Sequence, residues 1–226
     1  MTTYPILLFA AGLGTRMGNL TRDRPKPLIS VAGRNLLDHA LDLTRSPCVG
    51  RRVVNLHYKG QMIRDHLAGQ DILFSDETDL RLETGGGLRQ ALPLLGGDPV
   101  LTLNTDAVWR GPNPIDVLCA AWRDTMQSLL LVVPQSRAIG HPGKGDFLIA
   151  TDGQLSRGPG PIYTGLQLTR TAELNDIPDI AFSMNVLWDR AASQAGLFGV
   201  EYPGHWCDVG KPDSIPLAEE LLSRHV

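Results

Sequence analysis

Short apolar runs alternate along the chain with longer stretches in which apolar residues return at the i, i+3, i+4 spacing of an amphipathic helix. The runs are apolar throughout, as is typical of strands that are covered on both faces. A strand followed by a helix and then another strand implies parallel crossover connections, and hence an α/β fold. We expect strands at 6–10, 52–56, 71–74, 100–104 and 129–133, and helices at 35–45, 60–68 and 84–95.

The pattern changes after residue 133. Segments 147–150 and 154–156 flank Asp152-Gly153, which is a hairpin signal, and 162–168 alternates like a strand that is exposed on one side. Helices are expected at 182–195 and 212–224, with a buried strand at 206–209 between them. We therefore predict one domain over 1–226, a doubly wound Rossmann-like mixed sheet. Its nucleotide-binding half covers about 1–135, and a smaller mixed half at about 136–226 takes a second substrate.

The loop after the first predicted strand carries the most distinctive chemistry. Gly12 and Gly14 let the backbone approach a ligand closely, and successive loop amides can point at phosphate oxygens. Arg16 offers a planar fork for phosphate, and Lys26, held between two prolines, offers a point charge. The loop is therefore predicted to be a phosphate cradle, and an ordinary strand-turn with incidental glycines is the alternative.

Two other phosphate-binding patterns do not fit this loop. A dinucleotide fingerprint needs a third glycine where Met17 stands, and a Walker loop needs a Gly-Lys-Ser/Thr run that is missing here.

Composition narrows the class of ligand. The 226 residues are 42% hydrophobic, which is enough for a buried core, and the net charge is −3. No Lys/Arg cluster is dense enough to follow a nucleic-acid backbone, whereas a small anionic ligand needs only a few placed cations.

The three cysteines, Cys48, Cys119 and Cys207, are odd in number and far apart, so no disulfide framework is indicated. Since no signal peptide or membrane span is visible, we expect a soluble, cytoplasmic protein.

Two aspartates are candidate metal ligands. Asp106 ends an apolar strand at its carboxyl end, and Asp208 stands among apolar or small residues, where a carboxylate must be paired, metal-bound or at the surface. Mg²⁺ favours oxygen ligands and keeps several waters, so a pair of carboxylates beside a triphosphate suits it. A helix cap or a surface turn is the alternative for each aspartate alone.

Gly85, Gly86 and Gly87 fall in the first turn of a predicted helix, where Thr84 could be the cap. Each glycine costs a helix roughly 1 kcal/mol relative to alanine, so something other than helix stability must favour them. Close approach of a flat ligand is one explanation, with Gly85 and Gly86 beneath a nucleotide base. Tight packing against the loop at 10–16 is the other.

The Ala10–Arg16 loop and the Pro25-Lys26-Pro27 run together resemble the signature of sugar-nucleotide pyrophosphorylases, which join a nucleoside triphosphate to a sugar 1-phosphate. Asp106 and Asp208 match the two aspartates that ligate one Mg²⁺ in that family, although Thr105 and Lys211 replace the commoner glycine and threonine. The run at 82–88 and the segment at 204–210 are most similar to the branch that transfers uridylyl groups to N-acetylmuramate 1-phosphate in cell-wall recycling.

The resemblance implies the nucleotide-diphospho-sugar transferase fold, with UTP and a sugar 1-phosphate as substrates, in a monomer or small homo-oligomer. It also implies four groups of site residues. The implied catalytic residues are Arg16, Lys26, Asp106 and Asp208, and the implied metal ligands are Asp106 and Asp208. The implied nucleotide-binding residues are Ala10, Ala11, Gly12, Gly14, Thr15, Arg16, Lys26, Glu83, Gly85, Gly86 and Asn104. The implied sugar-phosphate-binding residues are Asp106, Gly145, Gly165 and Asn185. For Asn185, a plain helix position facing solvent is the alternative.

Two other classes of function stay open at this point. Guanylyl, thymidylyl or cytidylyl transfer to another phosphorylated acceptor would use the same cradle. A silent regulatory domain that binds nucleotides would be expected to lose Lys26 or a metal aspartate, and this chain keeps them. The acidic segment at 76–79 is expected to be solvated, and Trp122 and Trp188 are expected to pack in the core or an interface.

Overall fold

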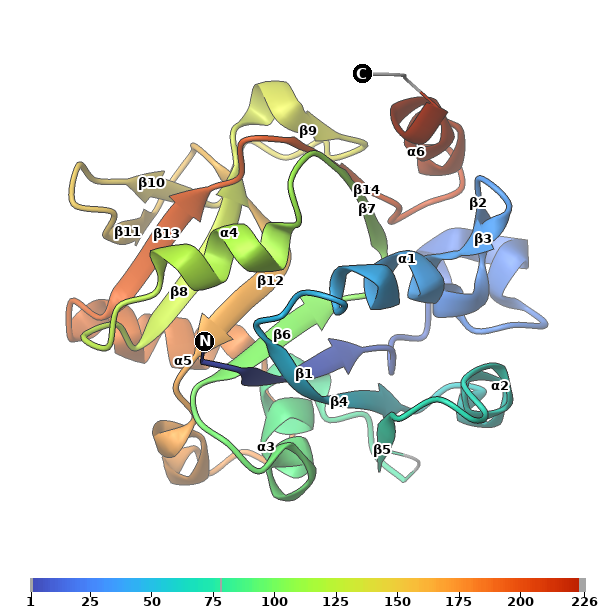
Figure 1. Ribbon diagram of the computed structural model, residues 1–226, viewed down its shortest axis with the longest axis horizontal. Coiled ribbons are helices and arrows are strands. Elements are labelled where there is room, and N and C mark those ends of the chain that lie inside the picture. The colour runs from blue at the N-terminus through green and yellow to red at the C-terminus, as the bar shows by residue number, and fades with distance from the viewer. Residues whose placement is uncertain (1, 78, 224–226) are drawn as a thin grey trace.

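The computed structural model describes residues 2–77 and 79–223, and within them a seven-stranded sheet runs in the order β13-β8-β12-β6-β1-β4-β5 (Figure 1). Neighbouring strands are parallel except around β12, which is antiparallel to both β6 and β8. The predicted α/β class and mixed sheet are confirmed. The strands are β1 Tyr4–Phe9, β4 Val49–Leu56, β5 Leu73–Asp76, β6 Val100–Asn104, β8 Ser128–Val133, β12 Ile162–Thr169 and β13 Leu197–Glu201.

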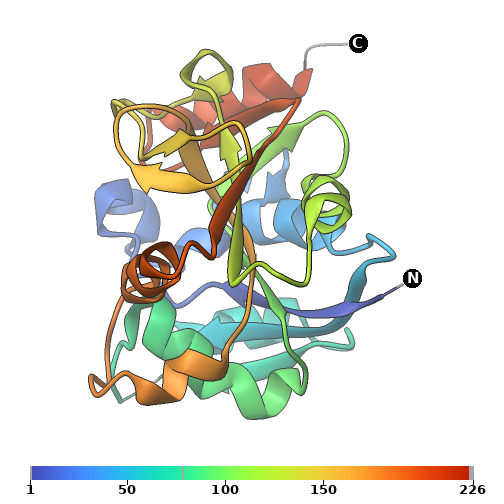
Figure 2. The ribbon, with the colours of Figure 1, turned by 90° about the vertical axis from the view of Figure 1, so that its left-hand side faces the viewer.

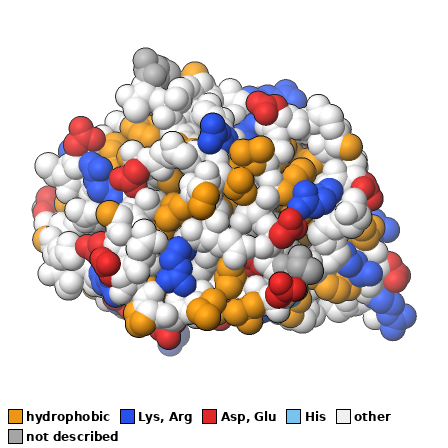
Figure 3. Space-filling view, turned by 90° about the horizontal axis from the view of Figure 1, so that it is seen from below, with side chains coloured by type: hydrophobic (Ala, Val, Ile, Leu, Met, Phe, Trp, Pro, Cys, Tyr) orange, Lys and Arg blue, Asp and Glu red, His pale blue; other side chains and the backbone are white. Residues whose placement is uncertain are grey.

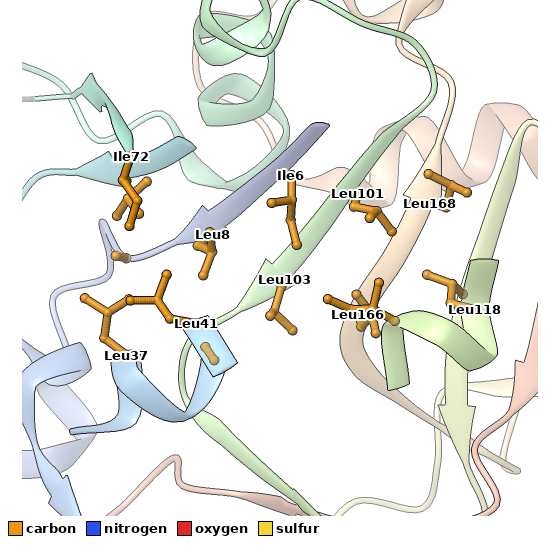
Figure 4. Packing of buried hydrophobic residues seen from close by; sticks show 14 of the residues in the cluster. Ile6, Leu8, Leu37, Leu41, Ile72, Leu101, Leu103, Leu118, Leu166 and Leu168 are labelled. Atoms are coloured by element: carbon orange, nitrogen blue, oxygen red, sulfur yellow. The ribbon is translucent and has the colours of Figure 1, made fainter. Parts of the chain in front are cut away.

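Helices cover both faces of this sheet. Helices α1, α2 and α4 pack their apolar residues on one face, where they form the cluster drawn in Figure 4. Helices α3 and α5 cover the opposite face, and Figure 2 shows α4 and α5 on either side of β8 and β13. The helices are α1 Leu36–Leu43, α2 Gly60–His66, α3 Glu83–Leu95, α4 Pro114–Ala121, α5 Met184–Ser193 and α6 Ser214–Ser223, with 3₁₀ turns at η1 Thr15–Thr21, η2 Lys26–Leu28, η3 Gln135–Arg137 and η4 Ala172–Asp176.

Strand β12 corrects one prediction. The alternation at 162–168 suggested a strand that is exposed on one side, yet apart from the half-buried Tyr163 every residue of β12 is buried. The reason is its central place: helix α4 packs against β12 from one side, and Trp188 of α5 stacks edge-on against Tyr163 from the other, with ring centroids 4.8 Å apart. Buried Gln167 is compatible with this place because it bonds Thr102 and Trp188.

Outside the main sheet, β14 pairs with β7 in antiparallel and with β9 in parallel orientation. Helix α6 packs on this small sheet through a third apolar cluster. The expected helix at 212–224 is observed as α6, with residue 224 outside the described residues, and the Asp152-Gly153 hairpin is observed as β10 and β11. The remaining strands are β2 Ser30–Val31, β3 Arg34–Asn35, β7 Ala107–Arg110, β9 Ala138–Ile139, β10 Phe147–Ile149, β11 Leu155–Arg157 and β14 His205–Asp208.

Some boundaries and elements differ from expectation. The strand expected at 71–74 is β5, two residues further on, where it pairs with β4 from Val53↔Leu73 to Leu56↔Asp76. Helix α4 and strand β13 were not predicted. The start of α4 did carry a signal, since Pro114 opens the helix and the Asn113 side chain caps it by accepting from the Ile115 amide at 3.0 Å.

Within the described residues, no helix is long and apolar enough to cross a membrane. On the face shown in Figure 3, the described Lys and Arg side chains are interspersed with acids and hydrophobic side chains, and they form no continuous basic strip there.

Candidate functional site

A cavity of about 370 Å³ opens at the carboxyl ends of four parallel strands, β1, β4, β5 and β6. The predicted position of the loop after β1 and of Asp106 at this edge is confirmed. Seven of the proposed site residues line the cavity: Ala10, Ala11, Gly12, Lys26, Glu83, Asn104 and Asp106. The other lining residues are Phe9, Pro27, Asn55, Glu77, Arg81, Thr84, Thr105 and Ser183.

The loop after β1 lines part of this cavity with Ala10, Ala11 and Gly12. The Ala10 and Ala11 amides donate to Asn55 Oδ1 at 2.7 and 3.3 Å, so they point into the protein and not at a ligand. Over the described residues, the amides from Gly12 to Gly14 have no protein acceptor. An unpaired amide near a cavity favours an anion, so the amides that are available to a phosphate are those after Ala11.

Gly14 at the end of this loop has to be glycine. Its φ is +65°, and an added Cβ would lie 2.9 Å from Lys26 Cβ and 2.8 Å from Thr21 Cγ2. The turn therefore packs directly on the base of the Lys26 side chain. Thr15 and Arg16 then open the 3₁₀ helix η1 and are exposed.

Lys26 and Asp106 form an ion pair in the cavity. Lys26 begins the short helix η2 after Pro25, and its Nζ lies 2.7 Å from Asp106 Oδ2. The side chains are 10% and 31% exposed, respectively, so the pair is only partly screened by water. Asp106 is held in place by its neighbour Thr105, whose hydroxyl donates to the Phe9 carbonyl oxygen at 2.8 Å and so ties the end of β6 to the end of β1.

Strand pairing brings Asp208 to the same place. The register of β14 and β7 sets Asp208 opposite Ala107, and the Val209 amide donates to the Asp106 carbonyl oxygen at 2.9 Å. Burial raises the pKa of Asp208, and the charge of Asp106 raises it further, whereas Lys26, Arg16 and His141 lower it. The two carboxylates therefore repel each other.

Arg16 reaches this acidic pair past Gly210. An added Cβ on Gly210 would lie 2.9 Å from Asp208 Oδ2 and 3.3 Å from Arg16 Nη1. Three distant parts of the sequence thus meet at one edge of the sheet, where they bring together Arg16, Lys26, Asp106 and Asp208.

This edge could hold a divalent cation only together with other ligands. In the part of the chain that the structure describes, no three His, Cys, Asp or Glu side chains gather as a metal site. Asp106 and Asp208 supply two carboxylates, and Mg²⁺ is commonly held by one or two carboxylates plus substrate phosphates and water. The mutual repulsion that raises the pKa of Asp208 is what a bound cation would relieve.

The glycine run at the start of α3 packs against the protein. The Gly85 and Gly86 amides both donate to the Phe182 carbonyl oxygen, at 2.8 and 3.1 Å. An added Cβ on Gly85 would overlap the Phe182 ring, and one on Gly86 would lie 2.5 Å from the Ile180 carbonyl oxygen. The packing partner is thus the segment 180–182 and not the expected loop at 10–16. Gly85 and Gly86 do not line the cavity.

Thr84 does not cap α3. Leu82 occupies the cap position, and the Thr84 hydroxyl accepts from the Met184 amide at 2.9 Å, which joins the starts of α3 and α5. The neighbouring Glu83 lines the cavity in a left-handed conformation, with φ +59°. Such a conformation in a non-glycine residue stores strain and often marks a functional site.

The candidate sugar contacts lie further out. Gly165 backs the cavity-lining Asn104, since an added Cβ would lie 2.7 Å from Asn104 Cβ. Gly145 packs against the backbone of Gly160, and the Asn185 Oδ1 atom, exposed at the start of α5, accepts from Arg157 Nη2 at 2.8 Å. Gly145, Gly165 and Asn185 do not line the cavity.

Sequence reasoning missed Asn55 and Glu77. The expectation that the segment 76–79 is solvated is wrong for Glu77, which is 3% exposed and lines the cavity; Thr78 lies outside the described residues. Burial raises the pKa of Glu77, while hydrogen bonds from the Leu82 amide and the Asn55 side chain lower it. A signal was available for Asn55, a polar residue that follows two valines near the end of a strand.

Comparisons with known proteins agree on one family. Residues 6–195 match the model of the MobA-like NTP transferase domain. The chain is 37% identical to N-acetylmuramate alpha-1-phosphate uridylyltransferase from Caulobacter vibrioides, over 96% of each chain. It is 32% identical to the protein of that name from Neisseria meningitidis serogroup B, over 95% of this chain and 96% of the relative. The crystal structure of HddC from Yersinia pseudotuberculosis has a similar fold, with a TM-score of 0.77 at 21% identity, over 98% of this chain and all of that one.

Proposed function

Because the chain belongs to the family of the MobA-like NTP transferase domain, we propose that it transfers the uridylyl group of UTP to N-acetylmuramate 1-phosphate and releases pyrophosphate. The product would be UDP-N-acetylmuramate. One observation carries the proposal beyond the names of relatives: Arg16, Lys26, Asp106 and Asp208 gather at the same edge of the sheet as a cavity and free loop amides. That edge suits two polyanions that must be brought together.

The chain's own groups would hold the triphosphate. The free amides from Gly12 to Gly14, together with the Arg16 guanidinium, would bind the β- and γ-phosphates of UTP. Lys26 would leave Asp106 and contact the α-phosphate or the incoming sugar phosphate. The base would occupy the end of the cavity lined by Glu77, Arg81 and Thr84.

The reaction needs no general base. A sugar 1-phosphate oxygen is already ionised near neutral pH, so it can attack the α-phosphorus directly. A new P–O bond forms, the bond from the α-phosphorus to the bridging oxygen breaks, and pyrophosphate leaves with that electron pair. Catalysis then rests on positioning and on charge neutralisation, as in phosphoryl transfer.

The carboxylates fit a Mg²⁺ ion. Asp106 and Asp208 would hold it, with substrate phosphates and water completing its ligands. When bound, the ion supplies positive charge between the two substrates and so lowers their mutual repulsion.

A pyrophosphate-release assay tests the proposed function. The purified chain is incubated with Mg²⁺ and each of UTP, GTP, dTTP and CTP against a panel of sugar 1-phosphates. We expect release with UTP and N-acetylmuramate 1-phosphate, and none without the divalent ion. Turnover with another base and sugar would reassign the specificity within the family. If no combination of nucleotide and sugar phosphate released pyrophosphate, the chain would be a silent nucleotide-binding domain.

The same proposal implies a setting. We propose a cytoplasmic enzyme of cell-wall recycling that works as a monomer or small homo-oligomer. Its three free cysteines suit a reducing compartment.

A further inference from the structure

Asn55 joins two walls of the cavity. It is the penultimate residue of β4, it is 2% exposed, and its Oδ1 accepts from the Ala10 and Ala11 amides at 2.7 and 3.3 Å. Its Nδ2 donates to Glu77 Oε1 at 2.7 Å. The amide side chain therefore faces the phosphate loop with its oxygen and the acidic residue with its nitrogen.

Glu77 continues this chain of hydrogen bonds to the start of α3. Its Oε2 accepts from the Leu82 amide at 3.1 Å, and Leu82 is the cap residue of α3. In the described residues Glu77 makes no ion pair with a Lys or Arg side chain, although it is 3% exposed. A buried carboxylate that is held by neutral donors is costly, so its retention calls for a role.

Gly87 shows that the helix is shaped around this carboxylate. An added Cβ on Gly87 would lie 2.5 Å from Glu77 Oε1 and 3.1 Å from Asn55 Nδ2. The third glycine of the run thus makes room for the Asn55–Glu77 pair, whereas Gly85 and Gly86 make room for the segment 180–182.

We propose that Asn55 and Glu77 are positioning residues that hold the phosphate loop after β1 in register with the wall of the cavity at the start of α3. This inference rests on the proposed function and deepens it. Because Asn55 occupies the Ala10 and Ala11 amides, the peptide planes that follow are oriented to leave the Gly12 to Gly14 amides for phosphate. The pair would therefore set the spacing between the loop that binds the triphosphate and the wall of the cavity that binds the base.

Reversing the polarity of the pair provides the test. Asn55→Asp alone places two carboxylates face to face, and Glu77→Gln alone turns an NH₂ group toward either the Asn55 NH₂ or the Leu82 amide. In the double variant, the new carboxylate at 55 can accept from both loop amides and from the glutamine NH₂, while the glutamine oxygen accepts from the Leu82 amide. Each link of the hydrogen-bond network from the loop to Leu82 is then restored, with the bond between positions 55 and 77 reversed in direction.

Binding of UTP with Mg²⁺ is measured by calorimetry, alongside the KM of each substrate and thermal stability. Each single variant should weaken UTP binding at least about tenfold, because a buried polar group loses its partner. The KM for the sugar phosphate should stay within about threefold, since the pair does not face that substrate, and the double variant should recover UTP binding to within about threefold of wild type.

Gln167→Leu is the matched control. Gln167 is fully buried and bonds Thr102 and Trp188 in the same sheet, but it does not line the cavity. It should lower thermal stability without a selective loss of UTP affinity, which separates positioning from general destabilisation.

Three results would overturn the inference. One is wild-type UTP binding in both single variants. Another is a folded double variant that binds UTP no better than the weaker single variant. The third is a double variant that does not fold. The inference requires it to fold, since the reversed pair satisfies the same backbone amides. If the single variants do not fold, the double variant decides alone. Because calorimetry needs no turnover, an inactive wild-type protein would refute the proposed function and leave this test intact.

Discussion

Replacing Lys26 by Met should change metal binding and turnover in opposite directions. Lys26 Nζ lies 2.7 Å from Asp106 Oδ2, and Asp106 is proposed to ligate Mg²⁺, so the lysine and the metal would compete for this carboxylate. Removing the lysine frees that oxygen and leaves the Asp106–Asp208 repulsion less compensated. The variant should therefore bind a divalent ion more tightly without nucleotide, although it should lose the cation that we propose stabilises the transition state.

The magnitudes follow from the geometry. At 2.7 Å and an effective dielectric constant of about 20, the gross attraction of the pair is about 6 kcal/mol. With side chains that are 10% and 31% exposed, desolvation cancels most of it, and a net of about 1–2 kcal/mol remains. The metal Kd should therefore fall by about 5- to 30-fold. Loss of one preorganised cation should lower kcat/KM by about 10²- to 10³-fold.

Titration with Mn²⁺, followed by electron paramagnetic resonance, measures the first effect, and pyrophosphate release measures the second. Lys26→Arg keeps the charge and should bind the metal about as wild type does. Arg16→Met removes a nearby cation that makes no ion pair within the described residues, so it should tighten metal binding less. A folded Lys26→Met protein that binds Mn²⁺ no more tightly than wild type would refute the competition.

Other variants test packing and charge. Gly85→Ala should destabilise the fold by about 1–3 kcal/mol and lower the Tm by about 2–10 °C, because the new Cβ would overlap Phe182. Gly12→Ala, whose new Cβ meets open space, should keep the Tm and weaken UTP binding. A lower Tm for Gly12→Ala together with an unchanged Tm for Gly85→Ala would contradict the packing argument. Asp208→Asn should abolish turnover yet raise the Tm of the nucleotide-free protein at neutral pH. Folding raises the pKa of Asp208, so above the folded-state pKa its ionised form destabilises the folded protein. Below the unfolded-state pKa the carboxyl is protonated in both states, and a gain in the Tm of Asp208→Asn that persists there would argue against this cause. If Asp208 binds the metal as proposed, its protonation competes with metal binding. The acid limb of kcat/KM should then lie above the ordinary Asp pKa and move to lower pH as the Mg²⁺ concentration is increased, and a limb that does not respond to Mg²⁺ would contradict this.

Local patterns in the sequence were enough for the fold class and for part of the site. Apolar runs followed by helical periodicity indicate parallel crossovers, and parallel strands bring their carboxyl ends to one edge. The loop after β1 and Asp106 were therefore expected at the same edge of the sheet, and Lys26 was marked by its flanking prolines. These predictions depend on short-range steric and hydrophobic preferences, which a single sequence displays directly.

The rest depended on contacts between residues far apart in the chain. The register of β7 with β14 sets Asp208 beside Asp106; the family resemblance implied this pair, but no local pattern at 205–208 specifies that partner. Likewise, Glu77 looked solvated in its acidic segment, but Asn55 and the Leu82 amide bury it at the cavity. Strand register and the pairing of buried polar groups are settled by packing over the whole molecule, so only the tertiary structure could decide them.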